Sequence, residues 1–245
     1  MFIGLLTFAG YVLITLAPFT LAPLALALFI IIPFLFANLL GFEMRRPAFW
    51  VFLGTPLLFL VTSLGFFLLA EADASKWALT IVVTIGLALY AENLFAFYHL
   101  PSTYQAYSLE YLSLMLYIGS SFFLASGLYL AQLFLEVPLP VSAVIIFFVV
   151  FFSSLAEYWV SKIGFETALP FVVTGAVLLT QFYVALSLLP TGYTTNAAAF
   201  AIGLYVYYGL SRAMVLEKLT GTVLRRYAGF GAILLVGVLI TALWS

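Results

Sequence analysis

The stretch VSAVIIFFVVFFSSLAEYWVS, residues 141–161, decides the fold class of this chain. It carries one charge, Glu157, in 21 residues. As an α-helix it would be about 31 Å long, at about 1.5 Å per residue, and the hydrocarbon core of a bilayer is ~30 Å thick. It lacks the alternation of polar and apolar residues that a membrane barrel strand shows. The stretch therefore predicts a transmembrane helix.

The whole chain has this character. Of its 245 residues, 66% are hydrophobic and 7% are charged, whereas a soluble domain carries about 25% charged residues. Charges, prolines and glycines divide it into nine apolar stretches, at about residues 2–17, 20–40, 49–70, 77–98, 107–134, 141–161, 168–189, 196–212 and 227–244. We predict an all-α polytopic membrane bundle of eight or nine transmembrane helices, arranged as hairpins plus a final helix. Because the connections are short, residues 1–245 are expected to form a single transmembrane domain.

The first forty residues need a division of their own. Residues 2–40 contain no charge, and as one helix they would be about 58 Å long, far more than a bilayer requires. Pro18, Thr20 and Pro23 predict a break and a new helix start. The alternative is a re-entrant first segment, which would place the N-terminus on the other side of the membrane.

The basic residues predict the orientation. On a nine-helix arrangement, seven of the eight fall on one side of the membrane: Arg45, Arg46, Lys162, Arg212, Lys218, Arg225 and Arg226. Only Lys76 falls on the other side. Lys and Arg favour cytoplasmic loops, so we expect a plasma-membrane protein with its N-terminus in the cytoplasm and its C-terminus outside. The four tryptophans agree, because all of them lie at predicted helix ends.

Composition excludes several chemistries. The chain has no cysteine and a single histidine, His99, which leaves no thiolate metal site, bis-histidine haem or multi-histidine metal site. Its only aspartate is Asp73, so the paired aspartates of membrane prenyltransferases are absent. A net charge of −1 makes nucleic acid an unsuitable ligand. We expect no metal and no cofactor, and as partners the lipid bilayer and either another membrane protein or a second copy of this chain.

Polar residues gather at the predicted cytoplasmic ends of the helices. They are Asn38, Glu92, Asn93, His99, Glu110, Glu157 and Arg212. Glu92 and His99 lie two helical turns apart and share a face if their helix continues past Tyr98. In one interpretation, hydrated or Arg212-paired acids hold the bundle in register. In the other, the same residues form a pocket that faces the cytoplasm and binds a cation, relays protons or acts as acid and base.

Residues 212–226 form a second candidate site. Val215, Leu219 and Val223 follow one another at intervals of four, and the basic residues are Arg212, Lys218, Arg225 and Arg226. Four basic residues minus Glu217 leave a net charge of +3. This pattern predicts an amphipathic segment that lies on an anionic cytoplasmic leaflet. The alternative is a docking surface for a soluble partner.

Three function classes are compatible with the sequence. The favoured one is a non-catalytic subunit or scaffold of a membrane complex, which predicts tolerance of Glu157→Gln. The second is a small transporter or channel with an acidic inner gate, which needs an outward polar path; the residues for such a path are Thr84, Ser120, Ser121, Ser126, Thr174, Thr180 and Gln181. The third is an enzyme that modifies lipids at the inner leaflet, with Glu92 or Glu157 as its base.

Overall fold

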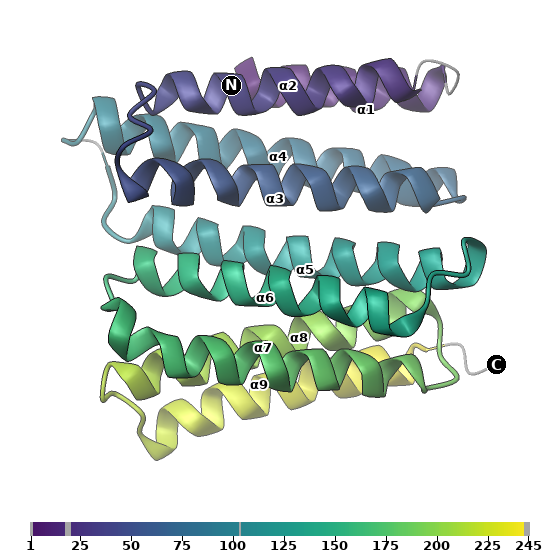
Figure 1. The fold of residues 1–245 in the computed structure, drawn as a ribbon, viewed down its shortest axis with the longest axis vertical. Coiled ribbons are helices and arrows are strands. Elements are labelled where there is room, and N and C mark those ends of the chain that lie inside the picture. The colour runs from purple at the N-terminus through teal and green to yellow at the C-terminus, as the bar shows by residue number, and fades with distance from the viewer. Residues whose placement is uncertain (1, 18–20, 103, 243–245) are drawn as a thin grey trace. The chain divides into compact units, whose positions relative to one another are not determined.

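The computed structural model describes residues 2–17, 21–102 and 104–242, and that part of the chain forms nine α-helices (Figure 1). They are α1 (Phe2–Leu16), α2 (Leu21–Leu39), α3 (Pro47–Leu69), α4 (Asp73–His99), α5 (Ser108–Phe134), α6 (Leu139–Val160), α7 (Phe165–Ser187), α8 (Tyr193–Val215) and α9 (Gly221–Ile240). Seven of these described helices, α3 to α9, are long and apolar enough to cross a membrane. The predicted all-α, multi-pass bundle is therefore confirmed.

The first two helices are shorter. α1 has 15 residues and α2 has 19, which correspond to about 22 Å and about 28 Å. The predicted division of the first forty residues is thus confirmed. Pro18 and Thr20, to which we attributed the break, lie outside the described residues, whereas Pro23 lies in the first turn of α2. α1 is shorter than the shortest helices that usually span a bilayer, which have roughly 17 residues.

The chain divides into two compact units, Met1–Ser120 and Ser121–Ser245, and the boundary between them lies within α5. In the first unit, α1 packs against α2 and α4, and α3 packs against α2 and α4. The hydroxyl groups of Tyr11 on α1 and Ser63 on α3 share a hydrogen bond of 2.8 Å. Because both residues are fully buried, this bond satisfies polar groups that the lipid-embedded interior would otherwise leave without a partner.

In the second unit, consecutive helices pack in chain order: α6 on α7, α7 on α8, and α8 on α9 (green to yellow in Figure 1). Glycines allow two of these contacts. A Cβ added to Gly175 of α7 would lie 2.4 Å from the ring of Tyr207 on α8, and one added to Gly209 of α8 would lie 2.2 Å from the ring of Tyr227 on α9. Close approach at small residues provides the van der Waals contact that associates helices in lipid.

α6 and α8 end in the same way. The second residue after each helix, Lys162 or Glu217, has a left-handed backbone with φ of 60° or 55°. The next amide donates a hydrogen bond to a carbonyl five residues back, at 3.0 Å for Ile163 and 2.8 Å for Lys218. These are Schellman motifs. They stop both helices at corresponding points, so the last turns of α6 and α8 carry their polar side chains at matching positions.

The last helix begins earlier than predicted. α9 starts at Gly221 rather than at residue 227, because the Oγ1 atom of Thr220 caps it by accepting a hydrogen bond of 3.3 Å from the amide of Val223. Residues 212–226 are therefore not one amphipathic helix. They comprise the last turn of α8, a turn, and the first turns of α9. The location of this segment on the membrane surface stays a prediction.

Candidate functional site

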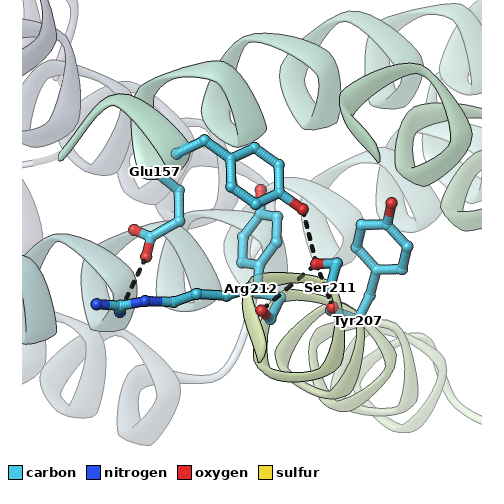
Figure 2. A network of polar contacts seen from close by, with 6 residues as sticks. Glu157, Tyr207, Ser211 and Arg212 are labelled. Carbon is cyan, nitrogen blue, oxygen red and sulfur yellow. Dashed lines mark hydrogen bonds and ion pairs between the residues drawn. The ribbon is translucent and has the colours of Figure 1, made fainter. Parts of the chain in front are cut away.

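Of the predicted polar residues, Glu157 and Arg212 come together in the second unit (Figure 2). Glu157 lies three residues before the end of α6, and Arg212 lies three residues before the end of α8. The Nη1 atom of Arg212 is 3.8 Å from the Oε1 atom of Glu157. The Glu157 side chain is 3% exposed and the Arg212 side chain 27%. The structure thus forms an ion pair with a buried carboxylate and a guanidinium that reaches the surface.

Two layers of hydrogen bonds continue from this ion pair along α6 and α8. The Tyr158 hydroxyl donates to the Ser211 Oγ atom at 2.7 Å, and Ser211 in turn donates to the Tyr207 carbonyl at 2.6 Å. One turn further, the Tyr208 hydroxyl shares a 2.9 Å hydrogen bond with Ser153. We call these residues the α6–α8 polar seam; it consists of Ser153, Ser154, Glu157 and Tyr158 on α6, and of Tyr208, Ser211 and Arg212 on α8.

The seam is closed rather than open to a channel. Its serines and Tyr158 are buried, as is Tyr208, and their hydroxyl groups bond to one another or to helix carbonyls. In membrane proteins an interhelical hydrogen bond of this kind contributes about 0.6 kcal/mol on average and about 1.7 kcal/mol at most. The arrangement is therefore suited to holding α6 and α8 in one register.

Apolar residues occupy the next two turns of both helices. They are Ile146 and Val150 on α6 and Phe200 and Leu204 on α8, and each is at most 1% exposed. Another polar contact of this unit, between the Gln132 side chain and the Tyr183 hydroxyl at 2.9 Å, joins α5 to α7 rather than α6 to α8. In the described part of the second unit, the seam thus does not continue as a polar path across the bundle.

The remaining predicted residues lie in the first unit. The Asn93 side chain donates to the Leu89 carbonyl at 2.9 Å and accepts from the Ser108 hydroxyl at 2.7 Å, so it connects α4 to the start of α5. α4 continues to His99, whose exposed ring stacks on Phe95 with centroids 4.7 Å apart.

The other first-unit candidates are the acids and Asn38. Glu92 and Asn38 are exposed, and Glu110 is half-buried in the first turn of α5. Within residues 2–17, 21–102 and 104–242, no three His, Asp or Glu side chains form a group that could hold a metal ion. The ion pair in the second unit joins two of the candidate residues directly.

The basic residues of the 212–226 segment lie around the turn between α8 and α9. Lys218, Arg225 and Arg226 are exposed. The Arg225 Nε atom donates to the Gly221 carbonyl at 3.2 Å, within the first turns of α9. Arg212 differs from the other three, because it is half-buried and faces Glu157.

A cavity of about 680 Å³ lies between α7, α8 and the start of α9. Its lining includes Thr174 and Phe182 of α7, Gly203 and Tyr207 of α8, and Leu224 of α9. The Tyr207 hydroxyl donates to the Phe171 carbonyl, and this bond turns the polar end of the ring toward α7. The cavity thus presents mostly hydrocarbon to an occupant.

The sequence analysis missed the tyrosines and serines of the seam. A local signal for them exists: Tyr208 precedes Arg212 by one turn, and Ser153 precedes Glu157 by one turn, so polar residues recur on one face of each helix. Which of these faces meet depends on the packing of α6 and α8. Comparison with protein family models, curated proteins and solved structures finds no match for this chain.

Proposed function

We propose that this multi-pass helical membrane protein is a non-catalytic subunit or scaffold of a membrane complex. The observation that carries the proposal is the exposure of α9. Only 6% of its 18-residue apolar window is buried within the chain, against 28–56% for the six other candidate spanning helices. Of its 20 residues, Gly231 alone is buried. A helix with so little of its surface buried within the chain has most of that surface available for a partner.

Small residues on the free side of α9 support this assignment. A Cβ added to Gly229 or Gly237 would have nothing within 4 Å, whereas one added to Gly231 would lie 2.4 Å from Val206 of α8. Gly231 thus serves the contact with α8, and the other two glycines face away from it. Glycines on the outer side of a membrane helix permit close approach of another helix, from a partner protein or from a second copy of this chain.

The α6–α8 polar seam fits the same role. Its hydroxyl groups bond to protein groups, and Glu157 is buried beside Arg212. A carboxylate in that position is poorly placed to accept a proton from a lipid substrate, which weighs against the enzyme alternative. The apolar turns beyond Tyr208 weigh against the transporter alternative, because a gate requires a polar route behind it.

We place the basic ends of α6 and α8 in the cytoplasm, with the N-terminus inside and the C-terminus outside the plasma membrane, an arrangement in which the 15-residue α1 also crosses the membrane. The charge distribution supports this orientation, because seven of the eight basic residues fall on that side.

The test is purification of the full chain from its own membranes in mild detergent, followed by mass spectrometry of the intact assembly. We expect a stoichiometric partner or a second copy, and its loss on Gly229→Leu. The matched control is Gly65→Leu, at an exposed glycine of α3 that also has open space around its Cβ position. A monomeric wild-type chain, or an assembly that Gly229→Leu leaves intact, would contradict the proposal.

A further inference from the structure

The cavity between α7, α8 and α9 has the length of one membrane leaflet. On α8 its lining runs from Gly203 to Met214, which are eleven positions apart and so about 16 Å apart at the helical rise. That is about half of the ~30 Å hydrocarbon core. Its volume of about 680 Å³ falls within the roughly 300–1,000 Å³ of sites that hold small molecules.

The length of the cavity distinguishes between two apolar occupants. A transmembrane helix of a partner crosses both leaflets, which takes about 20 residues or ~30 Å. An acyl chain of a phospholipid stays within one leaflet. A lining that extends over only about half of the hydrocarbon core therefore suits a single extended chain better than a spanning helix.

The inner wall has little to offer a polar ligand. The Tyr207 hydroxyl donates to the Phe171 carbonyl, and Ser211 accepts from Tyr158 and donates to the Tyr207 carbonyl. A polar group placed against this wall would lose its hydrogen bonds to water without regaining them, which is unfavourable. The part of an occupant that enters the cavity is therefore hydrocarbon.

Basic residues adjoin one end of the cavity lining in the chain. Leu219 and Leu224 line the cavity there. The exposed Lys218 comes directly before Leu219, and the exposed Arg225 comes directly after Leu224. With Arg212 paired to Glu157, residues 213–226 keep a net charge of +2, three basic minus one acidic. Clustered Lys and Arg residues at a membrane surface attract anionic lipid head groups.

We propose that this cavity is a lipid site: it holds one acyl chain of an anionic phospholipid, whose head group lies against Lys218 and Arg225. The site is separate from the outer face of α9 to which the partner is assigned. Such a site selects lipids by the charge of the head group and accepts acyl chains of different structure in the cavity.

The test measures lipid binding to the delipidated full-length chain in detergent by native mass spectrometry. The probes are phosphatidylglycerol and phosphatidylcholine with the same 16- and 18-carbon chains. We expect phosphatidylglycerol to saturate at one molecule per chain and to bind more tightly than phosphatidylcholine. Equal binding of the two lipids, or many unsaturable molecules per chain, would overturn the proposal, because neither result requires a site.

Two kinds of variant locate the lipid. Thr174→Trp fills the cavity from an exposed position of α7, and Val173→Trp is its matched control on the adjacent exposed residue outside the lining. We expect at least a tenfold loss of phosphatidylglycerol binding with the first and none with the second. Leu224→Trp fills the same cavity from α9 and replaces Thr174→Trp if that variant fails to fold. Unchanged binding in a folded cavity-filling variant would overturn the proposal.

Charge removal tests the head-group end. The double substitution Lys218→Ala and Arg225→Ala should weaken phosphatidylglycerol binding about thirtyfold, which corresponds to about 2 kcal/mol at about 1 kcal/mol for each charge, and should leave phosphatidylcholine binding unchanged. Arg45→Ala, an exposed cation of the first unit, is the control and should have no effect. A similar loss in the control would assign the effect to overall charge and would overturn the site.

Discussion

Replacing Arg212 with methionine is expected to cost far more stability than replacing Glu157 with glutamine. The Glu157 carboxylate is 3% exposed, and its Oε1 atom lies 3.8 Å from the Arg212 Nη1 atom. At an effective dielectric constant of about 20, opposite unit charges at this distance attract each other by about 4 kcal/mol. Arg212→Met removes that attraction and leaves a buried carboxylate behind, so we expect a loss of about 3–5 kcal/mol in unfolding free energy.

The reverse substitution has a smaller effect for a geometric reason. Glu157→Gln removes the buried charge and nearly preserves the shape, while the remaining Arg212 side chain is 27% exposed and reaches water. We expect a cost of about 1 kcal/mol. The double variant should also lose only about 1–2 kcal/mol, because neither charge is then left alone. The two substitutions are therefore expected to couple by about 2–5 kcal/mol.

The assay is reversible unfolding in mixed micelles with increasing sodium dodecyl sulfate, followed by the fluorescence of the four tryptophans. The control is Lys76→Met, at a partly exposed cation whose Nζ atom lies 4.0 Å from the exposed carboxylate of Asp73. This substitution should change the unfolding free energy by less than about 1 kcal/mol. The reasoning would be refuted if the two single substitutions lowered the unfolding free energy equally and the loss in the double variant were the sum of the two.

Three further outcomes follow from the structure. Tyr208→Phe should reduce the unfolding free energy by about 0.6–1.7 kcal/mol, because it removes a hydroxyl that bonds to serines of α6; the same unfolding assay measures it, and no change would mean that the bond has no net value. Gly209→Leu should lower the melting temperature, since its Cβ position is 2.2 Å from the Tyr227 ring and overpacking costs about 1–3 kcal/mol; Gly65→Leu, with open space around it, should not. In Phe2→Cys, the single thiol of an otherwise cysteine-free chain should react with an impermeant reagent from the cytoplasmic side, and labelling only from outside would refute the proposed orientation.

The sequence was sufficient to predict which segments are helical. Residues 141–161 were expected to span, and α6 runs from Leu139 to Val160. The start of α9 was placed six residues too late, because Arg225 and Arg226 resemble a loop when charge is taken as the limit of a span. The capping contact of Thr220 extends the helix back through them.

The candidate site was only partly predictable. Glu157 and Arg212 were recognised, and their contact was one of the interpretations that the residues permitted. Glu92 resembles Glu157 in its local sequence, yet it is exposed on α4 and belongs to the first unit. The sequence analysis missed Tyr158, Tyr208 and Ser211, because the sequence of one helix does not indicate whether its tyrosine contacts a serine of another helix.

The sequence by itself determined the class of protein and the helical segments, because a backbone in lipid must satisfy its hydrogen bonds within each segment. That constraint is local and can be read from length and hydropathy. Only the tertiary structure decided which polar side chains meet, how little of α9 is buried, and where the cavity lies. Those features depend on how each helix is rotated about its axis and how closely it packs. A helix that is apolar on all sides carries no amphipathic stripe that would specify either one.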